Sequence, residues 1–102
     1  MNRTFPIESA LIAALDAGDF VRRHGNSLSE LLHMIAGDCG LDLYCEAERL
    51  LDGLSPDPVG VGRAVREMRD LLADADAPAD RYAAALRWHG ARLTDLASRL
   101  PA

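Results

Sequence analysis

Residues 82–100, which read YAAALRWHGARLTDLASRL, carry the strongest structural signal in the chain. One set of positions recurs at alternating intervals of four and three residues: Tyr82, Leu86, His89, Leu93, Leu96 and Leu100. This spacing places a narrow seam along one side of a helix, as in the helices of a bundle. We therefore expect a bundle helix here, with His89 on its buried side as a hydrogen-bonded core histidine.

The rest of the chain also favours helices, because aromatic and β-branched residues are sparse and no stretch alternates with a period of two. A capping-box pattern that begins at Ser27 predicts one helix start, and Asp38 is expected to cap another. Expected breaks fall at Gly18, Gly25, Asn26, Gly53, Pro56 and Pro58. The sequence therefore predicts an all-α fold, a compact antiparallel bundle of four or five helices, with residues 1–102 as a single domain.

The composition is that of a folded domain, with 49% hydrophobic and 26% charged residues. The apolar run at residues 11–15 is too short for a signal peptide or a membrane span. The net charge of −5 argues against direct contact with nucleic acid or a membrane surface. We expect a cytoplasmic protein with reduced thiols, because in one helix Cys39 and Cys45 would lie about 9 Å apart, beyond disulfide reach.

Residues 38–52, which read DCGLDLYCEAERLLD, concentrate the charge of the chain. They hold five acids against the single base Arg49, so they carry −4 of the net −5. At about 100° per residue, a helix over this stretch has one apolar face and one charged face. The apolar face is expected to be core: Cys39, Leu43, Tyr44, Ala47, Leu50, Leu51 and Leu54.

The opposite face is the candidate partner-binding surface, with these residues: Asp38, Leu41, Asp42, Cys45, Glu46, Glu48, Arg49 and Asp52. One interpretation is a solvated face, which is what a charge run usually forms. The other is a docking face for a basic protein, in which the acids steer association and Leu41 and Cys45 form a desolvated centre. The residues alone leave both interpretations open.

Three short motifs of this stretch, Cys39-Gly40, Leu43-Tyr44 and Ala47-Glu48-Arg49, resemble a segment of the immunity proteins that neutralise colicin D-type, tRNA-cleaving toxins. Those proteins are small acidic helical bundles that fill the toxin's basic active site with carboxylates. The resemblance implies an immunity protein whose partner is a basic nuclease toxin. It also implies that four carboxylates here mimic phosphates: Asp42, Glu46, Glu48 and Asp52.

Chemistry-bearing side chains are few and are not spaced for catalysis. Three histidines and two cysteines lack the two- to four-residue ligand spacing of zinc sites. No serine or cysteine stands beside His89 in the sequence, and a convex helix face provides no cleft. We therefore expect no enzyme activity, no metal and no cofactor.

An alternative hypothesis is a self-associating structural or regulatory protein. Trp88 is expected to pack against a neighbouring helix, with arginine stems over its ring. Arg81, Arg92 and Arg99 are expected on the same flank of this helix as Trp88. In the alternative, this flank meets the acidic face of a second copy. The near-balance between the acids of residues 38–52 and the arginines of the last helix favours it: Arg81, Arg87, Arg92 and Arg99. The acidic-face hypothesis favours a monomer, whereas this alternative requires a homodimer.

Overall fold

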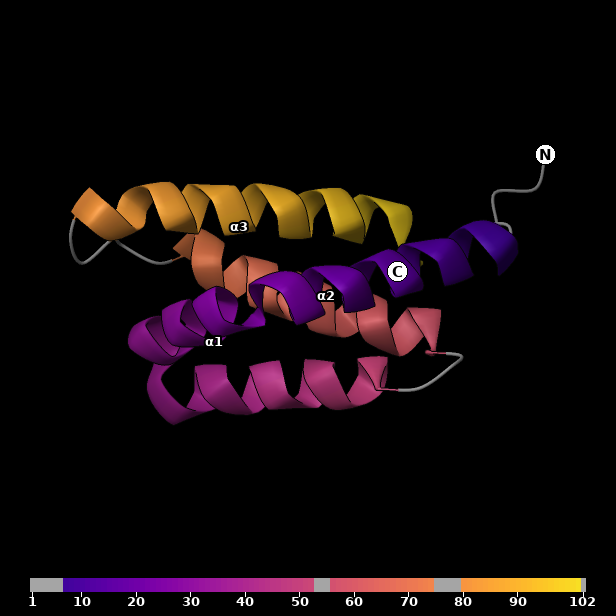
Figure 1. Ribbon diagram of the computed structural model, residues 1–102, viewed down its shortest axis with the longest axis horizontal. Helices are drawn as coiled ribbons and strands as arrows, with labels where there is room; N and C mark the ends of the chain where they lie inside the picture. The colour runs from indigo at the N-terminus through magenta and orange to yellow at the C-terminus, as the bar shows by residue number, and fades with distance from the viewer. Residues whose placement is uncertain (1–6, 53–55, 75–79, 102) are drawn as a thin grey trace.

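Three helices make up the chain in the computed structural model, which describes residues 7–52, 56–74 and 80–101 (Figure 1). Helix α1 spans Ile7–Leu51, α2 spans Pro58–Asp74 and α3 spans Asp80–Arg99. These ranges contain no strand. The predicted all-α class is confirmed, but the predicted count of four or five helices is wrong.

Helix α1 is kinked at Gly37, whose φ of 60° and ψ of −137° are not helical. The kink divides α1 into a first arm, residues 7–36, and a second arm, residues 38–51. A positive φ is accessible to glycine at little steric cost. A Cβ atom at this position would meet nothing within 4 Å, so the backbone conformation and not the available space requires glycine here.

The breaks expected at Gly18 and Gly25, and the helix start expected at Ser27, are wrong because α1 runs through all three positions. Both glycines are buried where the two arms pack together. A Cβ atom on Gly25 would lie 2.2 Å from the Tyr44 hydroxyl oxygen, and one on Gly18 would lie 3.8 Å from a Leu51 methyl group. Glycine at position 25 therefore permits a close approach of the arms, the distance at Gly18 is that of an ordinary van der Waals contact, and neither glycine ends the helix.

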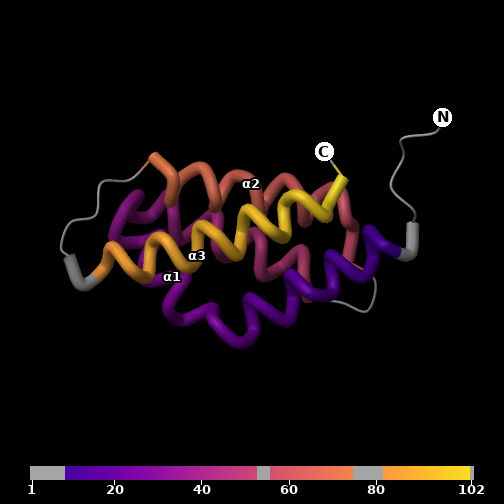
Figure 2. The backbone as a smooth tube through the Cα atoms, turned by 90° about the horizontal axis from the view of Figure 1, so that it is seen from above, coloured from indigo at the N-terminus to yellow at the C-terminus, as the bar shows by residue number. Residues whose placement is uncertain are grey.

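The first arm, the second arm, α2 and α3 follow one another in alternating directions, as Figures 1 and 2 show. The break predicted at Pro56 and Pro58 is confirmed, since α2 begins at Pro58. Asp57 caps this helix, because its carboxylate oxygens accept hydrogen bonds from the backbone amides of Val59 and Gly60, each at 3.2 Å.

The hydrophobic core lies between the two arms, α2 and α3. Its largest fully buried side chains are Leu28, Leu32, Val61, Val65, Met68 and Leu93. The predicted seam of residues 82–100 is confirmed: Leu86, His89, Leu93, Leu96 and Leu100 are buried and Tyr82 is half-buried. None of the helices in the described ranges combines the length and apolarity needed to cross a membrane.

The predicted apolar face of the second arm is confirmed in most of its positions. Tyr44, Ala47 and Leu51 are buried, and Leu43 and Leu50 are half-buried; Leu54 lies outside the described residues. Cys39 is exposed, so its predicted core position is wrong. The neighbouring Gly40 is buried instead, where a Cβ atom would lie 2.1 Å from the carbonyl oxygen of Leu32.

Candidate functional site

The second arm of α1 presents every residue of the predicted partner-binding surface to solvent: Asp38, Leu41, Asp42, Cys45, Glu46, Glu48, Arg49 and Asp52. Arg49 forms an ion pair with Glu46 along the same helix. Asp38 lies 3.9 Å from the exposed ring of His33. Asp42 and Asp52 contact no cation among the described residues, so most of the negative charge on this surface remains uncompensated.

An open groove of about 910 Å³ runs between the two arms of α1. Its first-arm wall carries Arg22, Arg23 and Asn26, and its second-arm wall carries Cys45, Glu48, Arg49 and Asp52. The expectation that this helix face provides no cleft is therefore wrong. The physical reason is the kink at Gly37, which returns the chain beside itself and turns one flank of the acidic helix into a wall.

The groove divides the predicted surface into two groups of four residues. Cys45, Glu48, Arg49 and Asp52 line the groove, whereas Asp38, Leu41, Asp42 and Glu46 lie outside it. Sequence reasoning missed the arginines of the opposite wall. The signal that could have found them is the pair Gly18 and Gly25, which stand seven residues apart and therefore mark one side of the first arm as a contact side.

Tyr44 lies between the two walls, with its hydroxyl directly over Gly25. This hydroxyl donates a hydrogen bond to a carboxylate oxygen of Glu48 at 3.3 Å. Burial of the ring, followed by the negative charge of Glu48, raises the pKa of Tyr44 above its ordinary value of 10.0. Tyr44 is therefore a protonated donor at neutral pH and helps to orient Glu48.

The first-arm wall contains a cation without a counter-charge. Arg23 forms an ion pair with Asp19 at 3.2 Å, one turn earlier on the same arm. Arg22 has no hydrogen bond or ion pair to any described residue, and its guanidinium lies close to Gly18. The groove therefore holds an unpaired arginine on one wall and, on the other, the carboxylates of Glu48 and Asp52, which form no ion pair among the described residues.

A second group of polar side chains joins α1 to α3 around His89, which is only 3% exposed. Its Nε2 atom lies 2.9 Å from the Ser27 hydroxyl, so the predicted hydrogen-bonded core histidine is confirmed. The expectation that no serine stands beside His89 holds only along the sequence, since the fold brings Ser27 there from 62 positions away. Burial, and then the charge of His24, lowers the pKa of His89.

Among the described residues, no third polar group joins the Ser27–His89 contact. The Nδ1 atom of His89 is buried and has no hydrogen-bond partner in this part of the chain, whereas a nucleophilic serine needs a histidine that a further group orients. The hydrogen bond between Ser27 and His89 ties the first arm of α1 to α3.

Trp88 packs against the first arm of α1, as expected, and remains 39% exposed. Its ring stacks on Phe20 with 5.9 Å between centroids, and the guanidinium of Arg92 lies 5.3 Å from the ring centre. Arg99, which was expected on the same flank, forms an ion pair with Asp16 instead. The side chain of Arg81 lies outside the described residues.

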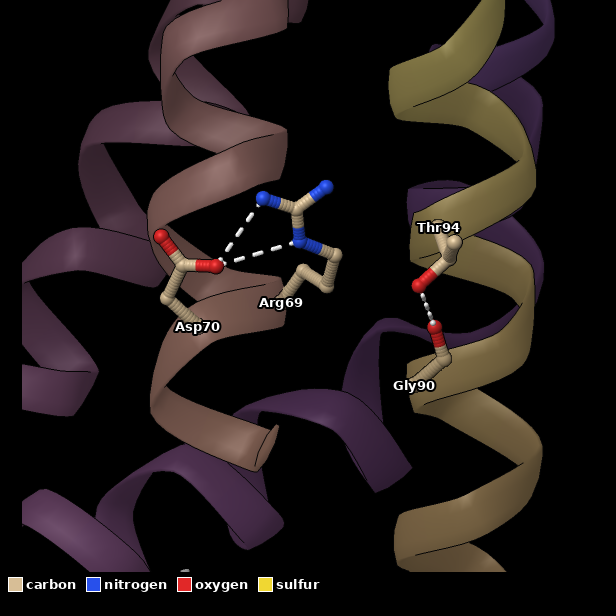
Figure 3. A network of polar contacts seen from close by, with 4 residues as sticks. All are labelled: Arg69, Asp70, Gly90 and Thr94. Carbon is tan, nitrogen blue, oxygen red and sulfur yellow. Dashed lines mark hydrogen bonds and ion pairs between the residues drawn. The ribbon is translucent and has the colours of Figure 1, made fainter. Parts of the chain in front are cut away.

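A smaller hollow of about 320 Å³ lies between α2 and α3. Figure 3 shows two of its polar side chains engaged within their own helices: Arg69 contacts Asp70 at 3.0 Å, and the Thr94 hydroxyl donates to the Gly90 carbonyl at 2.8 Å. Among the described residues, this hollow therefore has fewer charged side chains without a partner than the groove between the arms.

In the part of the chain that the structure describes, no three histidine, cysteine or acidic side chains gather as a metal-binding group would. Comparison with known proteins yields no match among family models, curated proteins or solved structures. The acidic surface and the groove beside it are therefore the features of the described chain that bear most directly on its function.

Proposed function

We propose that this chain is a non-catalytic binding protein whose second α1 arm docks onto a basic protein. The observation that carries the proposal is the exposure of the whole acidic surface, on which only Glu46 is neutralised by an arginine of the same helix. Uncompensated carboxylates steer a basic partner toward this surface. Leu41 and Cys45, exposed in their midst, provide apolar area that binding would desolvate.

The partner we propose is the nuclease domain of a toxin, in the first place a tRNA-cleaving one, with this chain as its cytoplasmic immunity protein. Support comes from the local resemblance of residues 39–52 to colicin D-type immunity proteins and from the net charge of −5. A nuclease must hold phosphates with clustered cations, which an acidic protein surface can occupy in their place. The proposal requires neither cofactor nor metal, and it requires no direct contact with nucleic acid.

We expect a neighbouring gene to encode a basic nuclease domain, and a charge-reversal pair tests docking on that domain. Asp42→Arg reverses an exposed, unpaired acid of the surface, and Glu67→Arg makes the same charge change on the exposed side of α2. We expect the Asp42 variant to lose about tenfold or more in affinity and to lose protection against the toxin, with its helical content unchanged. Equal binding by both variants would contradict docking through the second arm.

Self-association is the second candidate, and the exposed Trp88 with Arg92 over its ring favours it. Tryptophan and arginine are enriched at the centres of interfaces. In this case the Trp88 flank of one copy would contact the acidic surface of another, and the dimer would weaken as salt screens the charges. Sedimentation at high protein concentration separates the two candidates, because a monomer there excludes self-association.

A further inference from the structure

We infer that the groove between the arms of α1 receives a short peptide segment of the partner that carries both signs of charge. A basic side chain of that segment would pair with Glu48 and Asp52, and a carboxylate would pair with Arg22. The inference rests on the proposed function and deepens it, because it names the part of the acidic surface that selects the partner and the chemistry that it selects.

The groove has the size of a ligand site. Its volume of about 910 Å³ lies within the range of roughly 300–1,000 Å³ found for pockets that enclose small ligands. Its walls belong to two segments of one kinked helix, and Tyr44 bridges them above Gly25. This buried contact joins the two walls at the base of the groove.

The second-arm wall is suited to a cation. Glu48 and Asp52 are one helical turn apart, and both face the groove without a cationic partner among the described residues. The hydrogen bond from Tyr44 orients the Glu48 carboxylate. A guanidinium or ammonium group placed between the two carboxylates would form charge-assisted hydrogen bonds, which are stronger than neutral ones.

The first-arm wall is suited to an anion. Three arginines line the groove, but Arg23 is paired with Asp19, and Arg49 is paired with Glu46. Of these three arginines, only Arg22 has no partner among the described residues and is open to a ligand. An unpaired cation inside the groove opposes a purely basic segment and favours one that also brings a carboxylate.

The test uses three short synthetic peptides of equal length, one with arginine and glutamate two residues apart, one with arginine alone and one with glutamate alone. Binding is followed by two-dimensional NMR of the labelled chain. We expect the mixed peptide to shift the amide signals of Gly18, Gly25 and Asn26, with a Kd of about 1 mM, and to leave the indole signal of Trp88 unchanged. The single-sign peptides should bind the groove about tenfold more weakly.

The decisive variant is Arg22→Glu, with Arg63→Glu on the exposed side of α2 as the control of equal charge change. If only net negative charge mattered, both variants would bind the mixed peptide equally. We expect Arg22→Glu to weaken binding about tenfold and Arg63→Glu to leave it within roughly twofold. Arg22→Gln, which removes the charge without reversing it, guards against a folding defect and should also weaken binding.

Three results would overturn the inference. Arg22→Glu could bind the mixed peptide as tightly as the control does, the mixed peptide could leave the groove glycines unshifted, or the arginine peptide could bind the groove as well as the mixed one. Shifts confined to Leu41 and Asp42 would refute the groove and leave docking on the acidic surface standing. Docking itself is decided separately by the Asp42→Arg experiment on the nuclease domain.

Discussion

Because Gly25 lies against the Tyr44 hydroxyl, the effect of Gly25→Ala on stability should depend on whether that hydroxyl is present. A Cβ atom at Gly25 would lie 2.2 Å from the Tyr44 hydroxyl oxygen and 3.3 Å from the ring carbon that bears it. The tyrosine is only 8% exposed, so it has little room to move aside. Gly25→Ala should therefore destabilise the protein, although alanine is the better helix former.

The magnitude follows from two opposed effects. Overpacking of a buried contact costs about 1–3 kcal/mol. Replacing glycine by alanine inside a helix returns about 0.5–1 kcal/mol. The free energy of unfolding should therefore fall by about 0.5–2 kcal/mol in Gly25→Ala. In a Tyr44→Phe background the hydroxyl is absent, so the same change should range from neutral to about 1 kcal/mol stabilising.

Urea unfolding of the four proteins, followed by the fluorescence of Trp88 and by circular dichroism at 222 nm, measures both values. Tyr44→Phe alone serves as the control and should lose about 1 kcal/mol with the hydrogen bond to Glu48. The expected signature is a coupling energy of about 1–2 kcal/mol between positions 25 and 44. A Gly25→Ala effect of the same size in both backgrounds would refute the close contact.

Two further predictions concern stability. Gly90→Ala should raise the free energy of unfolding by about 0.5–1 kcal/mol, because a Cβ atom there meets nothing within 4 Å. Gly40→Ala should lower the free energy of unfolding, because its Cβ atom would lie 2.1 Å from the Leu32 carbonyl oxygen. Urea unfolding that ranks the two variants in the reverse order would contradict this prediction. His89, which faces His24 and Ser27, has a lowered pKa, so its imidazole binds a proton less readily in the folded chain than in the unfolded one. The contribution of His89 to stability should therefore be full above about pH 6.5 and decrease as the pH drops below that value. His89→Gln should flatten that dependence, which unfolding curves from about pH 7.5 to 5 would show; an unchanged pH dependence in this variant would contradict the prediction.

The sequence was a good guide to the helix at residues 82–100, because a four-three spacing is a local property of one helix. It was a poor guide to the breaks in α1. Glycine weakens an isolated helix, so Gly18 and Gly25 were expected to end one. Whether a glycine ends a helix or lets another segment pack closely depends on that other segment, which local patterns do not contain. Gly37, not Gly18 or Gly25, supplies the turn.

The candidate site was likewise predictable from the sequence only in part. The exposure of the acidic surface was predictable, since burying five acids that have a single arginine among them would be far costlier than leaving them solvated. The groove was not predictable, because it exists only where the kink at Gly37 returns the second arm beside the first. Arg22 belongs to the candidate site only through that return. In the sequence, only the seven-residue spacing of Gly18 and Gly25 marks its side of the first arm as a contact side.

The groove has two kinds of residues, which should respond differently to substitution. Its bridge, formed by Tyr44 over Gly25, is a buried contact between the arms, so a change there alters stability and groove shape together. Its walls carry the exposed side chains of Arg22, Glu48 and Asp52, and surface changes of this kind usually move stability by less than about 0.5 kcal/mol. If the groove binds a partner segment as proposed, substitutions at the walls should change which charge pattern it accepts and should alter stability less than substitutions at the Tyr44–Gly25 contact.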